Sequence, residues 1–273
     1  MMPETLRIGL DIGSTTIKCV VLDEADKIIY SCYERHLSLI AQKTRELLTR
    51  LDNEVVHGAP VRLSISGSAG MGLALGSHIS FVQEVYATKV AADMLMPGTD
   101  VIIELGGEDA KILFLQGTLE VRMNGSCAGG TGAFIDQMAV LLDVTPSELD
   151  ELAQGAERIY TIASRCGVFA KSDIQPLLNE GIPTTDLALS ALHAVARQTI
   201  GGLAQGIDIE PPVIFEGGTL AYNPTLVRVF REQLNLSDDQ VIVPRDPQIM
   251  VARGAALSLT DMFASSQPID LPD

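Results

Sequence analysis

The feature that most restricts the fold of this chain is a short pattern that occurs twice. The segments LDIGSTTIK (residues 10–18) and IELGGEDAK (residues 103–111) carry an acid, a glycine and a lysine at one constant offset of 93 residues: 11 to 104, 13 to 106 and 18 to 111. Each copy is typical of a strand, a sharp turn that contains glycine, and a second strand. Two copies of such a hairpin predict two related β-rich cores in one chain.

The remaining elements fit a fold with two α/β lobes, because strands come first, helices follow, and the two alternate later. Strands are predicted at residues 6–12, 17–23, 28–33, 61–66, 101–105, 111–115, 119–123, 212–215 and 240–243. Helices are predicted at residues 36–51, 82–95, 132–142, 146–154, 168–179, 185–206, 224–233 and 247–263. We expect a first lobe at 1–98 and a second at 99–264. The second lobe would hold a helical insertion near 124–210, and residues 265–273 would form a frayed tail.

Each repeated turn is suited to binding phosphate. Backbone N–H groups in a sharp glycine turn point into one concavity, and an acid at the end of the strand can hold Mg²⁺ through water. Two such hairpins that face each other would clamp the phosphates of a nucleotide. The competing interpretation is a pair of ordinary β-turns, and either hairpin alone would favour it. The repeated acid, glycine and lysine, with a third Gly-Gly loop in EGGT (216–219), favour nucleotide binding.

Other nucleotide-binding motifs and other partner classes are excluded. No lysine follows a glycine, so there is no Walker A sequence, and no G-x-G-x-x-G occurs. The net charge is −16, so nucleic acid is excluded as a partner because phosphate backbones require basic patches. No apolar run reaches the length of a membrane span, and the N-terminus lacks a signal-peptide pattern. We expect a cytoplasmic protein without membrane contact.

Two of the four cysteines lie in loops that lead into predicted helices. Cys127 lies in MNGSCAGGTGAF (123–134) and Cys166 in SRCGVFAKSD (164–173). Helix N-termini offer free N–H groups and a positive dipole end, which would stabilise an anionic iron–sulfur cluster. An all-cysteine [4Fe–4S] cluster needs four thiolates, so two per chain are half a site that a two-fold axis completes. From chemistry alone, two buried small hydrophobic thiols are an equally good interpretation.

The motifs together resemble those of a known family. IGLDIGSTTIK, ELGGEDAK and FEGGTLAYN are similar to the two phosphate loops and the adenosine loop of the acetate and sugar kinase/actin superfamily. Within it, the two cysteine segments resemble the ATP-dependent activators of 2-hydroxyacyl-CoA dehydratases and the ATP-binding subunits of benzoyl-CoA reductases. The resemblance covers nearly the whole chain, from residue 6 to residue 263. It implies a two-lobed α/β, actin-like (ribonuclease H-like) fold whose helical insertion carries the cluster cysteines.

The same resemblance implies an ATPase coupled to electron transfer under anaerobic conditions. It implies a homodimer with one [4Fe–4S] cluster between the subunits, bound by Cys127 and Cys166 of each. Hydrolysis of ATP to ADP with Mg²⁺ would change the shape of the dimer. One low-potential electron, supplied by a ferredoxin or flavodoxin, would then pass to a dehydratase or reductase component.

The resemblance also assigns roles to the loop residues. Asp11 and Glu104 would organise Mg²⁺, and Glu108 or Asp109 would orient the attacking water. The residues expected to bind the nucleotide are Gly13, Ser14, Thr15, Thr16, Lys18, Gly106, Gly107, Glu216, Gly217, Gly218 and Gly254.

Two loops depart from the pattern of the short activators, which carry Asp-Ile-Gly-Gly-Gln and Cys-Ala-Ala-Gly-Thr-Gly. Here the second phosphate loop reads ELGGE (104–108), so Glu108 stands where glutamine usually positions water, and the cysteine loop reads CAGGTG (127–132). Together with FVQE (81–84), these variants look more like activase domains inside long multidomain proteins. A partner on the same polypeptide therefore stays open.

The other two cysteines lead to a different prediction. If Ala25 and Asp26 form a two-residue loop, Cys19 and Cys32 face each other across a hairpin. Their apolar surroundings favour buried, reduced thiols over a second redox site.

Two other functions are alternatives to the activase. A small-molecule kinase, such as an amino-sugar kinase, shares the fold but needs an aspartate base in a sugar cleft and has no need of the cysteines. A nucleotide-dependent scaffold would change its dimer without a cluster. No convincing acceptor-site motif is present, so the activase is the main hypothesis.

Overall fold

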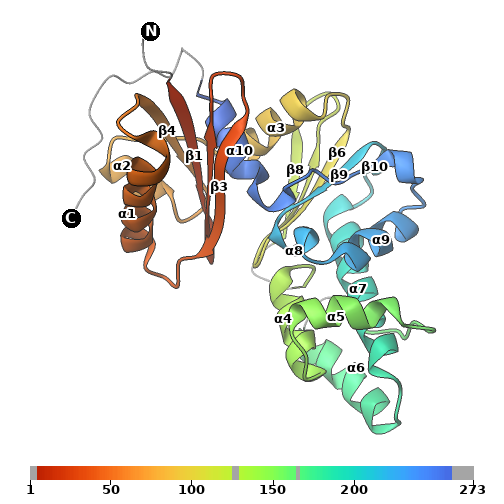
Figure 1. Cartoon of the computed structure of the whole chain (residues 1–273). Helices are drawn as coiled ribbons and strands as arrows, with labels where there is room; N and C mark the ends of the chain where they lie inside the picture. Colours follow the sequence, from red (N-terminus) through yellow and green to blue (C-terminus); the bar gives the residue numbers. More distant parts are fainter. Residues whose placement is uncertain (1–4, 125–128, 164–166, 260–273) are drawn as a thin grey trace. The chain divides into compact units, whose positions relative to one another are not determined.

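The computed structural model describes residues 5–124, 129–163 and 167–259 (Figure 1). The chain divides into two compact units, one made of residues up to 97 together with those from 249, and one made of residues 98–248. The predicted cluster ligands Cys127 and Cys166 lie outside the described residues, as does the predicted tail. In the described part of the chain, no helix is long and apolar enough to cross a membrane.

The first unit is built on a five-stranded mixed sheet of order β3-β2-β1-β4-β5. The strands are β1 (Leu6–Ile12), β2 (Thr16–Leu22), β3 (Ile28–Arg35), β4 (Val61–Ser66) and β5 (Ser80–Phe81). The helices are α1 (Ile40–Leu51), α2 (Met71–Gly76), α3 (Glu84–Leu95) and α10 (Met250–Leu257), with a π-helical turn at Asp52–Val56. Both faces of the sheet are covered: Val21 packs in one cluster with Leu47 of α1, and Val20 in another with Ala252 of α10.

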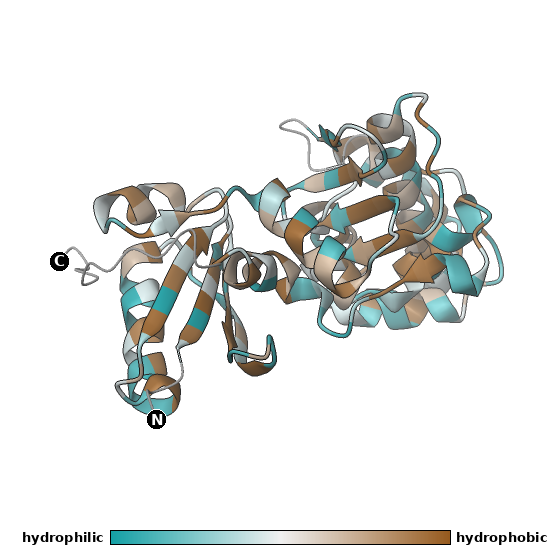
Figure 2. Ribbon diagram, turned by 90° about the horizontal axis from the view of Figure 1, so that it is seen from above, coloured by the Kyte–Doolittle hydropathy of each residue, from teal (hydrophilic) through white to brown (hydrophobic). Residues whose placement is uncertain are grey.

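The second unit has a sheet of order β10-β9-β6-β7-β8 and a group of helices. The strands are β6 (Val101–Leu105), β7 (Ala110–Phe114), β8 (Glu120–Met123), β9 (Val213–Glu216) and β10 (Val241–Ile242). The helices are α4 (Gly132–Leu141), α5 (Pro146–Gln154), α6 (Gly167–Asn179), α7 (Thr184–Thr199), α8 (Gly218–Ala221) and α9 (Pro224–Gln233). Shorter helical turns are Ile200–Ala204, Asp238–Gln240 and Pro247–Ile249. Figure 2 shows hydrophobic residues recurring along the strands, which form the core with helices such as α7, most of whose residues are buried.

The two sheets have the same topology. In the first, β1 pairs antiparallel with β2 and parallel with β4, β2 pairs antiparallel with β3, and β4 pairs parallel with β5. In the second, β6 pairs in the same senses with β7 and β9, β7 with β8, and β9 with β10. The short repeat in the sequence therefore marks a duplication of the complete five-stranded sheet. Helices α4 to α7 lie between β8 and β9 in the chain, as predicted for the insertion.

Helix α10 belongs to the first unit, which differs from the expected division that assigned residues up to 264 to the second lobe. Helix α10 belongs to the first unit because it packs closely on the first sheet, and the order of strands and helices along the sequence does not reveal that contact. A Cβ on Gly9 of β1 would lie 2.0 Å from the Ala252 carbonyl oxygen, and Ser64 Oγ donates to the Ala255 carbonyl at 2.8 Å. The helix therefore rests directly on the backbone of the first sheet.

The hairpin β2–β3 confirms the predicted pairing of Cys19 with Cys32, but not the loop from which it was inferred. The register shifts by one residue between Val21 and Leu22, so the turn is longer than two residues. Its backbone is closed by a hydrogen bond from Asp23 N–H to the Lys27 carbonyl.

Candidate nucleotide-binding loops

The turn between β1 and β2 contains the first predicted phosphate loop. Asp11 and Lys18 are register partners across this hairpin, and Lys18 Nζ donates to Asp11 Oδ2 at 2.7 Å. Gly13 N–H donates to the Thr16 carbonyl at 3.0 Å, which closes the turn. The two residues between them are exposed at the tip, where their backbone and hydroxyl groups can contact a ligand.

The turn between β6 and β7 repeats this geometry. Glu104 and Lys111 are register partners, and Lys111 Nζ donates to Glu104 Oε1 at 3.1 Å. Gly106 N–H donates to the Asp109 carbonyl at 2.8 Å, and the residues between them, among them Glu108, are exposed. The acid, glycine and lysine of the sequence pattern thus have equivalent positions and equivalent hydrogen bonds in both units.

Each of the two acids keeps one oxygen without a donor. Asp11 is 2% exposed and Glu104 is 7% exposed, yet among the described residues Asp11 Oδ1 and Glu104 Oε2 have no hydrogen-bond partner. A buried acceptor left without a donor costs about 1–3 kcal/mol. A hydrated Mg²⁺ would satisfy such an oxygen, because this cation prefers oxygen ligands and keeps several waters. Both acids therefore fit the cation that the resemblance implies.

The first site includes two residues that sequence reasoning did not assign to it. Ser66, at the end of β4, is the register partner of Asp11. Gly67 follows with a φ of 91°, and a Cβ there would lie 2.5 Å from Asp11 Oδ1 and 2.3 Å from the Ile12 carbonyl oxygen. Only glycine fits this place. The signal was present in the sequence as Ser-Gly directly after an apolar strand.

The equivalent strand of the second unit carries the predicted adenosine loop. Glu216 of β9 is fully buried and is the register partner of Glu104. Gly217 has a φ of 94°, and a Cβ there would lie 2.4 Å from the Leu105 carbonyl oxygen. Gly218 then begins α8. The acid and the two glycines therefore lie beside the second phosphate loop.

The first turn of α4 is hydrogen-bonded to the second phosphate loop. Gly132 N–H donates to the Gly106 carbonyl at 3.0 Å, and Ala133 N–H donates to the Gly107 carbonyl at 2.7 Å. Thr219 Oγ1 donates to the Gly106 carbonyl at 2.7 Å. The first N–H groups of a helix have no partner within the helix, and here the loop carbonyls supply one. The start of α4 is therefore bound directly to the loop.

The first turn of α6 packs against the middle of α4. A Cβ on Gly167, the first residue of α6, would lie 1.8 Å from Gln137 Oε1 of α4. The predicted helices after both cysteines are therefore present, although the cysteines themselves lie outside the described residues. Within the described ranges, no three His, Cys, Asp or Glu side chains gather as metal ligands. Exposed apolar side chains mark this surface, with Val140 79%, Val168 71% and Phe169 67% exposed.

Gly254 was expected to contact the nucleoside, and the structure places it inside α10. A Cβ on Gly254 would lie 1.8 Å from the Ala87 carbonyl oxygen of α3. This packing alone explains why a glycine occupies the position.

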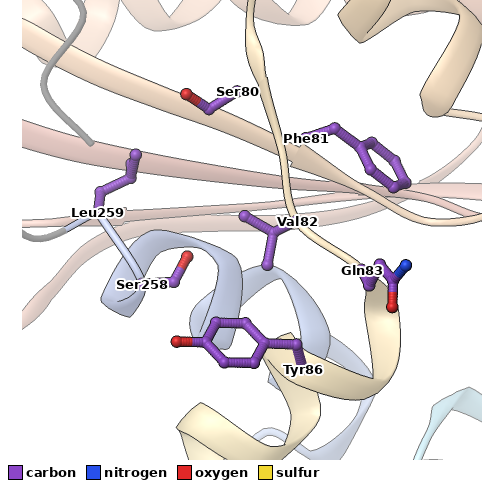
Figure 3. A pocket seen from close by; sticks show the side chains of 7 residues that line it. All are labelled: Ser80, Phe81, Val82, Gln83, Tyr86, Ser258 and Leu259. Carbon is purple, nitrogen blue, oxygen red and sulfur yellow. The ribbon is translucent and has the colours of Figure 1, made fainter. Parts of the chain in front are cut away.

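An apolar hollow of about 280 Å³ lies elsewhere in the first unit, between the start of α3 and the end of α10 (Figure 3). Val82 and Tyr86 face Ser258 across it. None of the predicted site residues lines this hollow, so it is distinct from the phosphate loops.

The helix after the adenosine loop is held by a buried carboxylate from α5. Asp150 Oδ1 accepts from Thr225 N–H at 3.0 Å, and Asp150 Oδ2 accepts from Thr225 Oγ1 at 2.9 Å. Burial raises the pKa of Asp150, while the hydrogen bonds from Thr225 oppose that rise. The second helical layer is thereby fixed to the loop that follows β9.

Comparison with known proteins finds one family model, the BadF/BadG/BcrA/BcrD ATPase family, which matches residues 8–258. The 2-hydroxyisocaproyl-CoA dehydratase activator of Clostridioides difficile is 31% identical over 95% of this chain and 97% of its own. The (R)-2-hydroxyglutaryl-CoA dehydratase activating ATPase of Acidaminococcus fermentans is 30% identical over 77% of this chain and 82% of its own.

Solved structures agree with these relatives. The activator of the 2-hydroxyisocaproyl-CoA dehydratase from Clostridium difficile, solved with bound ADPNP, superposes with a TM-score of 0.81 at 30% identity over 93% of both chains. A ROK family glucokinase from Streptomyces griseus superposes with a TM-score of 0.54 at 16% identity, over 92% of this chain and 98% of its own, which shows a shared fold alone. The predicted two-lobed, actin-like α/β fold is confirmed.

Proposed function

Because the chain belongs to the BadF/BadG/BcrA/BcrD ATPase family, we propose that it hydrolyses ATP to deliver a low-potential electron to a 2-hydroxyacyl-CoA dehydratase or a benzoyl-CoA reductase-like partner. Relatives at about 30% identity are dehydratase activators, which supports a dehydratase as the partner. A relative with bound ADPNP supports ATP as the nucleotide.

The chain's own residues would bind and orient the nucleotide. The exposed tips of both hairpins would offer backbone N–H groups to phosphate oxygens, and the free oxygens of Asp11 and Glu104 would hold Mg²⁺ through its waters. Glu108 and Asp109 lie in the second turn, where either carboxylate would accept a proton from water and align it with the terminal phosphate. Glu216 and the glycines that follow would lie around the nucleoside. No covalent enzyme intermediate is needed.

The observation that carries the proposal is the hydrogen bonding between the second phosphate loop and α4. The carbonyls of Gly106 and Gly107 accept from the first N–H groups of the helix, so the loop cannot change conformation without moving α4 or breaking these bonds. Helix α4 begins five residues after Cys127, and α6 begins one residue after Cys166. Loss of the terminal phosphate would thus be communicated to both cysteine segments.

Cys127 and Cys166 of two subunits would together hold one [4Fe–4S] cluster, which would supply the one-electron chemistry. The contact between Gly167 of α6 and Gln137 of α4 supports a shared site for the two cysteine segments, because it brings together the helices that follow them. The exposed apolar residues of α4 and α6 suit burial against a second subunit or the partner component.

Anaerobic purification with iron and sulfide analysis tests the proposal. We expect a brown dimer with about four irons per two chains, and colourless Cys127→Ser and Cys166→Ser variants. Cys19→Ser is the matched control. Cys19 is buried in the first sheet, so this substitution should leave the iron content unchanged. A parent protein without iron, or cysteine variants that keep the iron, would contradict the electron-transfer function. Phosphoryl transfer from ATP to a sugar would instead support a small-molecule kinase.

A further inference from the structure

His36 is buried at the end of β3, where it contacts the first phosphate loop twice. Its side chain is 2% exposed although the neighbouring Leu37 is 72% exposed. The ring Nε2 lies 3.0 Å from the Gly13 carbonyl oxygen. The backbone N–H of His36 donates to the Thr15 carbonyl at 3.2 Å. This one residue, directly after β3, therefore holds two of the peptide groups that form the turn.

The hydrogen bonds of the ring determine its tautomer. Ser38 N–H donates to His36 Nδ1 at 3.1 Å, so Nδ1 must be the acceptor and carry no proton. The proton of the neutral ring is then on Nε2, which donates to the Gly13 carbonyl. Both ring nitrogens are thus used, and the donor faces the phosphate loop.

These contacts orient the amide that follows Gly13. In a planar trans peptide the C=O and the next N–H point in opposite directions. The Gly13 carbonyl points toward the His36 ring, so the N–H of Ser14 points away from it. Ser14 and Thr15 are the exposed tip of the turn, so the fixed amide is accessible to a ligand.

The backbone that brings the ring to this place is strained. Leu37 and Ser38 have φ values of 50° and 64°, a left-handed conformation that bulky residues adopt rarely. Leu39 N–H donates to the His36 carbonyl at 2.8 Å across this turn. Such strain persists where the surrounding structure fixes it, and it gathers at functional sites. Here the three bonds of His36 to the loop and to Ser38 fix it.

We propose that His36 is a positioning residue that fixes the first phosphate loop in the conformation that binds the phosphates of ATP. It acts through Gly13 and Thr15 and does not touch the nucleotide. This role rests on the proposed ATP site, because the loop has no other ligand assigned to it.

Two substitutions separate the hydrogen bond from the His36 ring to the Gly13 carbonyl from the hydrogen bond that the ring accepts from Ser38 N–H. His36→Gln keeps an amide N–H that reaches the position of Nε2 and can donate to the Gly13 carbonyl. His36→Asn places its amide near Nδ1, so it keeps the contact with Ser38 and loses Gly13. With Mg²⁺ and ADPNP as the probe, we expect His36→Asn to bind about tenfold more weakly than the parent, the effect of one lost hydrogen bond, and His36→Gln within about threefold. A residue that only shaped its own turn would give the opposite order.

The control is His57→Asn, the same change at an exposed histidine of the same unit whose φ of 48° suits asparagine; its affinity should equal that of the parent. Deuterium exchange of the amides of residues 14–16, measured without nucleotide, should be faster in His36→Asn alone. Equal ADPNP affinity of His36→Asn and the parent overturns the inference. If the parent binds no ADPNP, the proposed function fails, and the deuterium exchange of residues 14–16 alone tests the role of His36. In that case, equal exchange rates in His36→Asn and the parent overturn the inference. If His36→Asn does not fold, a tenfold loss in His36→Gln overturns it instead.

Discussion

Replacing Gly254 by alanine separates a packing role from a nucleotide role. The new Cβ would lie 1.8 Å from the carbonyl oxygen of Ala87, 2.5 Å from its carbonyl carbon and 3.1 Å from its Cα. All three are backbone atoms of α3, so no side chain can turn away. Ordinary contact begins near 3.4 Å, so the oxygen must retreat by 3.4 minus 1.8, or 1.6 Å. Helices α3 and α10 would have to separate or tilt by about that amount.

The expected cost follows from two opposing effects. Overpacking a close interface costs about 1–3 kcal/mol, and the upper end applies because the clash is with backbone. Alanine in place of glycine inside a helix returns about 1 kcal/mol. We expect Gly254→Ala to lower the free energy of unfolding by about 2 kcal/mol, measured by urea denaturation with circular dichroism and no nucleotide.

Gly72→Ala is the matched control. Gly72 is an exposed residue of α2, and a Cβ there would meet no atom within 4 Å. The same substitution should therefore raise stability by up to about 1 kcal/mol. Gly254→Ala that is as stable as the parent would refute the packing argument, and a defect that appeared only as weaker ADPNP binding would assign Gly254 to the nucleotide.

Three further outcomes are expected. Asp150→Ala should lower the free energy of unfolding by about 2–4 kcal/mol in urea titrations, because the buried N–H and hydroxyl of Thr225 lose their acceptor. Asp150→Asn keeps an acceptor oxygen and should cost less, so equal losses in the two variants would contradict the role of these hydrogen bonds. The hydrogen bond between the two thiols raises the pKa of Cys19, to which burial adds, and lowers the pKa of Cys32. Peptide mass spectra should therefore show that iodoacetamide alkylates Cys32 before Cys19, and equal alkylation rates would contradict this prediction. Burial lowers the pKa of His193 below its ordinary 6.5, so the unfolded chain binds more protons and stability is lost as pH falls below about 6.5. His193→Asn should flatten the pH dependence of the urea midpoint in that range. An unchanged pH dependence would show that His193 is not its source.

Local signals predicted the parts of the fold that local chemistry decides. Helices α5 and α9 begin and end where predicted, since Thr145 and Glu148 form a capping box and a proline opens each helix. The alignment of acid, glycine and lysine predicted both hairpins, because a tight turn fixes the register.

Other features depend on contacts between distant segments. The predicted helix at 36–51 begins only at Ile40, because His36 is bound to the phosphate loop and the next two residues form a left-handed turn. Ser66 and Gly67 join the first site through strand order, which no single window of sequence displays. Helix α2 and strand β5 were not predicted, since each is too short for a periodic pattern.

The position of α10 has a consequence for the order in which the two units can complete their folds. Its residues 250–257 cover the face of β1 and β2 that carries Gly9 and Val20, yet the whole second unit, residues 98–248, is synthesised in between. Until α10 is made, among the described residues only α3, through Val90 and Leu95, can cover this apolar face of the first sheet. Each unit in this chain has its own core, but only the second consists of one continuous segment that can complete its fold as it emerges.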